Sequence, residues 1–160
     1  SLLMGYCHLG HNCLLGNGIV MSNAIQAAGH VVIEDRAVIG GCLGIHQFVH
    51  IGGMAMIGGM TRVIRDIPPY AMVEGHPGRL RGLNRVGLQR SGLVDRHEGR
   101  EFKQLKDVWN LLYRSDCLMA EALEQARSLE LLPAADHLCS FLEASIAKGR
   151  RGPTPALSHR

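Results

Sequence analysis

The stretch 31-VVIEDRAVIGGCLGIHQFVHIGGMAMIGGMTRV-63 decides the fold, because an aliphatic side chain returns in it at every sixth position. These positions are Ile33, Ile39, Ile45, Ile51, Ile57 and Val63. The same register continues toward the N-terminus through Ala27, Met21, Leu15, Leu9 and Leu3. An amphipathic helix repeats at about 3.6 residues and a lone strand at about 2, so a sustained period of six excludes both as the main element.

A second apolar or small residue lies two positions before each of these. The second set is Cys7, Cys13, Ile19, Ile25, Val31, Ala37, Leu43, Val49, Ala55 and Thr61. Two inward positions in every six predict a parallel β-helix, in which three hexads form one triangular coil and residues one coil apart stack at about 4.8 Å. Glycine often follows the aliphatic residue, and we expect the chain to bend there; these glycines are Gly10, Gly16, Gly40, Gly52 and Gly58.

The sequence predicts four segments in the chain. We expect a β-helix over residues 1–70, ending at Pro68-Pro69, because proline cannot donate to a strand ladder. A loop region rich in Gly and Arg follows over 71–93. Helical spacing of Phe102, Leu105 and Trp109 begins a domain of about three helices over 94–149. A Gly- and Pro-containing tail over 150–160 is expected to be disordered.

Composition narrows the class of protein. The 160 residues are 46% apolar and 19% charged, a composition typical of globular proteins. No apolar run in the sequence is long enough to span a membrane. A net charge of +3 is too small to indicate nucleic acid binding. Five cysteines without a C-x-x-C pair favour a reducing cytoplasm. Because the repeat starts directly after Ser1, we expect the C-terminal part of a longer protein.

Histidines supply the candidate chemistry. None of the five in the repeat, His8, His11, His30, His46 and His50, lies at an inward position. The spacing places His11, His30 and His46 on one edge of the prism in successive coils, beside Gly29 and Gln47. Imidazole bases next to a backbone N–H and a side-chain amide suit deprotonation of a hydroxyl and stabilisation of an oxyanion. Structural or surface roles for these histidines are the alternative.

Two other chemistries are disfavoured. The same histidines have spacings that zinc sites use, but no carboxylate flanks them and a hexad step moves a residue to another edge. We therefore predict no metal and no other cofactor. Nucleophile-elbow and dinucleotide motifs are missing from the sequence.

An ordered set of motifs points to a family. It comprises His8-Leu9-Gly10-His11-Asn12-Cys13, Ala28-Gly29-His30, Ile45-His46-Gln47-Phe48, Pro68-Pro69-Tyr70, Gly82-Leu83-Asn84 and Gly87-Leu88-Gln89-Arg90. This set resembles the acyl-ACP:UDP-N-acetylglucosamine O-acyltransferase family of lipid A synthesis, where ACP is acyl carrier protein. The resemblance runs from about Leu2 to Leu93 and implies a left-handed β-helix.

The resemblance also implies roles for individual residues. His11 would be the general base that deprotonates the sugar 3-hydroxyl, and the Gly29 N–H would stabilise the thioester oxyanion. Substrate would be held by His8, His30, His46, Gln47, Asn84 and Arg90. Gly59 would limit the length of the acyl chain. The implied partners are ACP carrying the acyl donor, UDP-N-acetylglucosamine, and two further copies of the chain in a homotrimer with the site between subunits.

Two positions depart from the family pattern. Asn12 stands where the family often has Asp, and Val86 where it often has a substrate-binding Glu. An amino-sugar variant of the acceptor is therefore one alternative. Others are an N-acyltransferase of the same pathway, a trimeric zinc hydratase on the same fold, and a non-catalytic β-helical scaffold.

Overall fold

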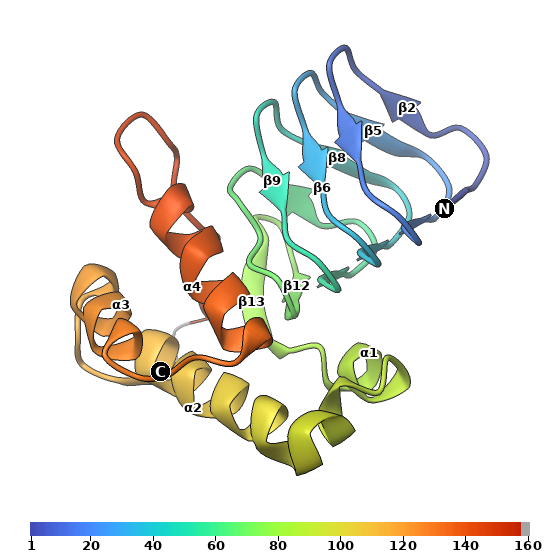
Figure 1. Ribbon diagram of the computed structural model, residues 1–160. Coiled ribbons are helices and arrows are strands. Elements are labelled where there is room, and N and C mark those ends of the chain that lie inside the picture. Colours follow the sequence, from blue (N-terminus) through green and yellow to red (C-terminus); the bar gives the residue numbers. More distant parts are fainter. Residues whose placement is uncertain (158–160) are drawn as a thin grey trace.

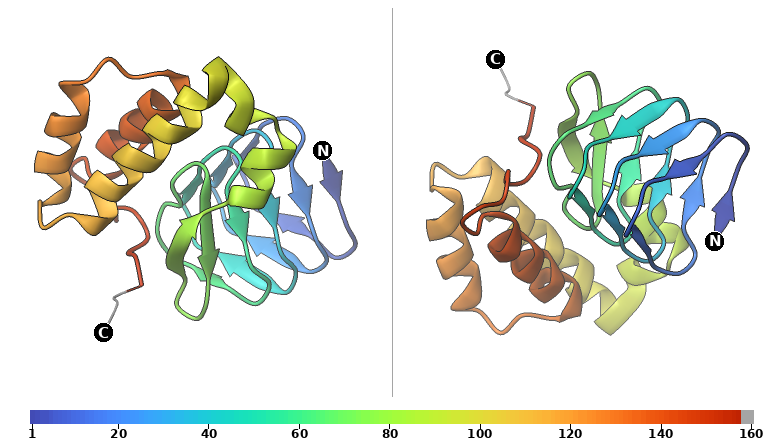
Figure 2. Two further views of the ribbon diagram at one scale, coloured as in Figure 1. Left: turned by 90° about the horizontal axis from the view of Figure 1, so that it is seen from below. Right: turned by 90° about the horizontal axis from the view of Figure 1, so that it is seen from above.

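The computed structural model describes residues 1–157 and contains a parallel β-solenoid of about four turns followed by a helical region (Figure 1). This confirms the predicted fold class. In both views of Figure 2 the coils stack side by side, with the N-terminus at one end and the helices beside the last coils.

Three parallel ladders form the sides of the prism. The first contains β1 (Leu2–Leu3), β4 (Val20–Met21), β7 (Val38–Ile39), β10 (Met56–Ile57), β12 (Ala71–Glu74) and, antiparallel to β12, β13 (Arg79–Leu83). The second contains β2 (His8–Leu9), β5 (Ile25–Ala27), β8 (Leu43–Ile45) and β11 (Arg62–Val63). The third contains β3 (Leu14–Leu15), β6 (Val32–Ile33) and β9 (His50–Ile51).

Each strand pairs with the strand one coil away, as the period of six predicts. Val20 lies opposite Val38, Gln26 opposite Gly44, and Ile33 opposite Ile51. Both predicted inward positions are buried in the complete coils, and Ile19 and Met21 have no exposed surface. The aliphatic ladders therefore form the core.

Three corners join the ladders, and each has its own composition. The glycine corner comprises residues 22–24, 40–42 and 58–60; the histidine corner 10–12, 28–30 and 46–48; the acidic corner 16–18, 34–36 and 52–54, with Tyr70 in the last coil. The third residue of each triplet adopts a positive φ, as in Asn12 (60°), His30 (59°) and Met54 (57°).

The glycines that follow the aliphatic residues have a different role from the one predicted. Their φ values lie outside the left-handed region, so they are not where the backbone needs glycine to bend. Instead, the next coil passes too close for a side chain. A Cβ on Gly52 would lie 2.3 Å from N of Pro69, and one on Gly40 would lie 2.4 Å from N of Gly59.

The β-helix continues beyond the two prolines. Tyr70 turns the last corner with φ 65°, and β12 then pairs with β10 in a register of 16 residues, Met56 opposite Met72. The predicted end at residue 70 is therefore four residues too early. The expected loop of 71–93 also contains the β12–β13 hairpin and the helix α1 (Arg85–Arg90). The six-residue repeat does not predict this hairpin, because the hairpin does not follow the repeat.

The helical region contains the predicted helices. After the kinked 3₁₀ segment η1 (Leu93–Gly99) come α2 (Arg100–Arg114), α3 (Met119–Arg127) and α4 (Pro133–Ser145). Buried Glu101 of α2 accepts the N–H of Ala134 at 3.0 Å, so a carboxylate faces the N-terminus of α4, where the helix dipole favours it. Within residues 1–157, every helix is too short or too polar to cross a bilayer.

The C-terminal segment 150–157 differs from the expected disordered tail. Pro153 bridges to Asp66 and Ala156 to Leu80, and Arg150 contacts both carboxylate oxygens of Asp66 at 2.7 Å. Asp66 is nearly fully buried and also accepts from Ser145 Oγ. A buried carboxylate thus holds the segment in place. Residues 158–160 of the predicted tail lie outside the described part.

Gly52→Ala should destabilise the fold by about 1–3 kcal/mol, because the added Cβ has to displace the backbone and ring of Pro69. Urea unfolding at constant m value would measure the loss. Gly44→Ala is the matched control, since its Cβ would meet nothing closer than O of Gln26 at 4.0 Å. Equal unfolding midpoints for the two variants would contradict the close-packing role.

Candidate active site

The predicted catalytic residues meet at the histidine corner. His30 donates its backbone N–H to O of His11 at 2.9 Å, and Phe48 donates to O of Gly29 at 3.1 Å, so the three coils are in direct contact. The His11 and His30 rings meet edge to face with centroids 4.9 Å apart. Phe48 stacks on His30 at 4.8 Å. These groups therefore lie at one edge of the prism, as their sequence spacing predicts.

The orientation of His11 is set by its neighbour. Nδ1 of His11 lies 3.0 Å from Oδ1 of Asn12. An amide oxygen can only accept, so Nδ1 carries the proton and Nε2 keeps its lone pair. Asn12 has φ 60°, a conformation that Asn tolerates well. The residue that departs from the family pattern therefore orients the His11 ring, without supplying a charge.

Gly29 lies directly against the His11 ring. A Cβ at position 29 would be 2.7 Å from Nε2 of His11 and 2.8 Å from Cε1. Within residues 1–157, the Gly29 N–H has no hydrogen-bond acceptor. The residue that lies against the His11 ring therefore has a backbone N–H that is unpaired in this part of the chain, and donors of this kind can stabilise an oxyanion.

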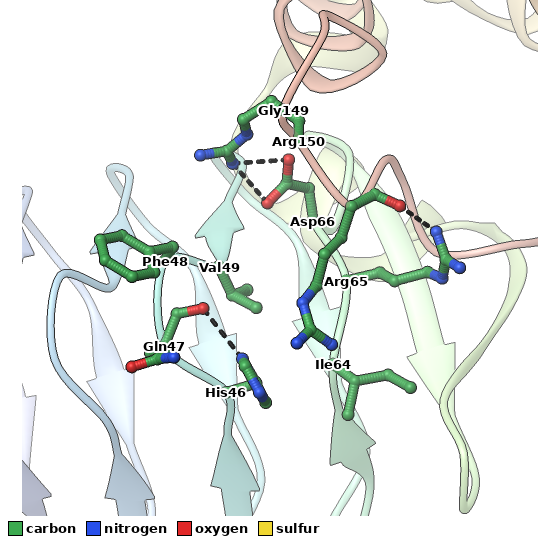
Figure 3. Close-up of a pocket in the computed structure, with 10 residues that line it drawn as sticks. His46, Gln47, Phe48, Val49, Ile64, Arg65, Asp66, Gly149 and Arg150 are labelled. Atoms are coloured by element: carbon green, nitrogen blue, oxygen red, sulfur yellow. Dashed lines mark hydrogen bonds and ion pairs between the residues drawn. The ribbon is translucent and has the colours of Figure 1, made fainter.

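His46 and Gln47 border a cavity of about 350 Å³ that extends toward the C-terminal segment (Figure 3). His46 Nδ1 donates to O of Gln47 at 3.0 Å, which again leaves Nε2 as the acceptor. Arg65, Arg150 and Arg151 add positive charge to the cavity, although Arg150 is paired with Asp66. Phosphate groups suit such a lining.

His8 lies away from the corner. It occupies β2 on a side of the prism, opposite Gln26, and its side chain is exposed. Within this chain it does not join the group formed by His11, Gly29 and His30.

Asn84 and Arg90 both belong to α1, beside the acidic corner. Asn84 caps the helix, accepting from N of Gly87 at 3.1 Å, and its Nδ2 donates to O of Met54 at 2.9 Å. Asn84 is thus buried and hydrogen-bonded within the chain. Arg90 is exposed in the last turn, and Val86 is 60% exposed, so an apolar side chain faces outward where the family often has Glu.

Two further cationic residues were missed by the sequence reasoning. Lys106 and Arg114 of α2 line a cavity of about 310 Å³ together with Arg81 and Arg85, which lie in the segment predicted as a loop rich in Gly and Arg. The helical spacing of Phe102, Leu105 and Trp109 indicates only the apolar face of α2. A search for cations at helical spacing on the opposite face would have found Lys106 and Arg114.

Gly59 lies at the glycine corner, away from His11. A Cβ at this position would lie 3.3 Å from O of Gly41, and Met60 N donates to the same oxygen at 2.9 Å. Gly41 and Gly59 thus leave the middle position of this corner without a side chain in consecutive coils.

No group of three or more His, Cys, Asp or Glu in residues 1–157 is arranged to hold a metal ion. His50, four residues after His46, directs Nε2 toward Glu34 at 2.8 Å.

Comparison with known proteins agrees with this geometry. Residues 66–154 match the model of UDP N-acetylglucosamine O-acyltransferase, domain 2. The chain belongs to this family. Over 156 residues it is 46% identical to the acyl-[acyl-carrier-protein]–UDP-N-acetylglucosamine O-acyltransferase of Synechocystis, covering 97% of the chain and 55% of that relative. The Gloeothece citriformis protein of the same name is 45% identical over the same share of both chains.

Solved structures of UDP-N-acetylglucosamine acyltransferases share the fold. The Arabidopsis enzyme superposes with a TM-score of 0.84 at 35% identity, covering 92% of this chain and 52% of the other. The Campylobacter jejuni protein gives 0.85 at 31% identity, covering 98% and 58%. The chain therefore spans about half the length of these acyltransferases.

Gly29→Ala should displace the His11 ring and break its contact with Asn12, because the new Cβ would overlap the end of a side chain that can rotate. We expect the unfolding free energy to fall by less than about 1 kcal/mol, the lower end of the cost of overpacking. Histidine ¹⁵N and ¹³Cε1 shifts would report the ring position.

Gly41→Ala provides the control, since it changes the equivalent position of the glycine corner, where the Cβ meets O of Asn23 at 3.0 Å. Unchanged His11 signals in Gly29→Ala would show that the glycine does not set the space for the base.

Proposed function

We propose that the full-length protein transfers a 3-hydroxyacyl or related acyl group from ACP to the 3-hydroxyl of UDP-N-acetylglucosamine, the first step of lipid A synthesis. The observation that carries the proposal is the close contact between the His11 ring, with Nε2 free, and Gly29, whose N–H is unpaired within residues 1–157, in a chain of this family. The Synechocystis and Gloeothece citriformis relatives are named for the same activity.

In the proposed reaction, Nε2 of His11 takes the proton of the sugar hydroxyl while the oxygen attacks the thioester carbonyl. Negative charge develops on the carbonyl oxygen, and the Gly29 N–H stabilises it. The tetrahedral intermediate then collapses, the C–S bond breaks, and the thiolate of the carrier takes the proton from His11. Asn12 holds the ring through Nδ1 throughout. The imidazolium forms without a neighbouring carboxylate, so this orientation is the contribution of Asn12.

The acceptor needs a site for its pyrophosphate. The cavity beside His46 and Gln47 offers the guanidinium groups of Arg65 and Arg151, which bind phosphate well. Arg90 supports the same role from α1. One side of the prism separates α1 from the histidine corner of its own chain, so Arg90 reaches a nucleotide there only from a neighbouring subunit.

A homotrimer would provide that neighbour. The outward positions of the first ladder are apolar in three consecutive strands, Val20, Val38 and Met56, and each is partly exposed. Apolar rows on a solvent-facing side suit burial against a second copy. In this arrangement the glycine corner of one subunit, with Gly41 and Gly59, would face the histidine corner of the next and receive the acyl chain.

The carrier protein would dock elsewhere. The cavity lined by Arg81, Arg85, Lys106 and Arg114 concentrates positive charge on the helical side of the chain. Such a cluster steers an acidic partner by long-range attraction. We assign this surface to the carrier and the arginine-lined cavity near His46 to the acceptor.

Incubation of the full-length protein with acyl-ACP and UDP-N-acetylglucosamine tests the activity, and mass spectrometry of the product distinguishes an ester from an amide. His11→Ala should lower turnover by about 10²–10⁴-fold, the usual contribution of general-base catalysis. Light scattering should give the mass of a trimer for both the wild-type protein and His11→Ala. Near-normal turnover of the folded variant would remove His11 from its assigned role.

Gly59→Met should shorten the preferred acyl chain. The Met side chain would fill the space beside Gly41, and each methylene no longer buried costs about 0.8 kcal/mol of binding. Long-chain acyl-ACP should therefore lose turnover while a shorter donor keeps it. Equal slowing with both donors would mean that Gly59 serves only the corner geometry.

A further inference from the structure

A second cluster of titratable side chains lies at the acidic corner, outside the proposed catalytic group. Glu34 is its centre. Its Oε2 accepts the N–H of Gly53 at 2.8 Å and lies 2.8 Å from Nε2 of His137 on α4. Its Oε1 lies 2.8 Å from Nε2 of His50 on β9. One carboxylate thus contacts two coils of the β-helix and one helix.

The cluster extends from Glu34 to Tyr70 through His137. Nδ1 of His137 lies 3.0 Å from the Tyr70 hydroxyl. With Nε2 donating to the carboxylate, Nδ1 of a neutral ring accepts from the hydroxyl, so all three groups are satisfied. Burial raises the pKa of Glu34, but the contacts with His137 and His50 outweigh it and hold the pKa well below its usual range. Burial and the charges of Glu101 and Glu34 raise the pKa of Tyr70 to about 12, so its hydroxyl keeps its proton.

Tyr70 adopts a backbone conformation that needs support. Its φ of 65° is the one that other corner residues share, such as Phe48 (63°) and Met54 (57°), and a bulky residue keeps it only when its surroundings hold it. Two contacts hold Tyr70: its N–H donates to O of Gly53 at 2.9 Å, and its hydroxyl bonds to His137. The ring is only 7% exposed.

Tyr70 in turn holds the start of α1. Its carbonyl accepts the N–H of Asn84 at 2.7 Å, and the Asn84 side chain bonds to Met54 of the same corner and to Gly87. A continuous set of contacts therefore connects α4 through Glu34, His137 and Tyr70 to the N-terminal cap of α1. Arg90 lies at the other end of this six-residue helix.

We propose that Glu34 and His137 are positioning residues that fix Tyr70 and, through it, the placement of α1 and Arg90. The consequence for catalysis rests on the proposed function, because Arg90 is the group that binds the nucleotide sugar there. The consequence for the backbone of α1 is independent of any activity.

Hydrogen–deuterium exchange of the full-length protein tests the backbone consequence. His137→Leu should accelerate exchange in residues 84–92 by about 3- to 10-fold, which corresponds to the loss of roughly one hydrogen bond. Tyr70→Phe removes only the hydroxyl and should act in the same direction. His137→Gln keeps one donor and one acceptor and should restore slow exchange.

Asp136→Asn is the matched control. Asp136 precedes His137 in α4 but is exposed and pairs with Arg127, away from the cluster. It should leave exchange in residues 84–92 unchanged. If His137→Leu affected α1 no more than Asp136→Asn does, or if it raised exchange equally in α2 and α4, the positioning role would be wrong.

Steady-state kinetics test the catalytic consequence. His137→Leu should raise KM for UDP-N-acetylglucosamine by the same factor of about 3–10, while kcat and KM for acyl-ACP change less than about twofold. A fall in kcat alone would contradict positioning of the acceptor. A wild-type protein without acyl transfer would refute the proposed function and leave the exchange experiment to decide the positioning role.

Discussion

The stacking of one coil on the next is the constraint on which the rest of the structure depends. Each coil donates its backbone N–H groups to the preceding or following coil, and each aliphatic residue rests on another of its kind 18 positions away. Because this spacing is strict, corner residues far apart in sequence meet side by side. Where the chain shortens the step to 16 residues, between β10 and β12, the repeat ends and the antiparallel β13 completes the sheet.

The stacking gives the three corners the same backbone conformation. Their side chains make them chemically different. The N–H of the middle residue in each corner triplet takes no part in the backbone hydrogen bonds between coils. At the acidic corner carboxylates occupy these donors: Asn17 donates to Asp35 and Gly53 to Glu34. At the histidine corner the Gly29 N–H has no such acceptor within residues 1–157, and Gln47 stands where Asp35 stands in the other corner. At this corner imidazoles and an amide take the place of acids, and the Gly29 N–H stays unpaired in the described part of the chain.

Features that repeat could be predicted from the sequence, and features that occur once could not. The period gave the inward positions and brought His11, Gly29 and Gln47 to one edge, because every coil repeats the same geometry. The predicted role of Gly52 was wrong. A bend and the close approach of Pro69 both require glycine, so the sequence does not distinguish them. The contacts of Tyr70 with His137 and of Asp66 with Ser145 and Arg150 join residues far apart in the sequence without any period, so no sequence pattern predicts them.

These single contacts share a physical character that explains their importance. Asp66 and Glu101 are buried carboxylates and Glu34 is a partly buried one, and each lies where a C-terminal element meets another part of the fold. Apolar packing alone would allow a helix to slide along the aliphatic side of the prism. A buried carboxylate prevents this sliding, because moving its partner leaves an uncompensated charge that costs about 3–5 kcal/mol. The β-helix thus supplies stability through many equivalent contacts, while a few charged ones determine where the helices sit, including the helix that carries Arg90.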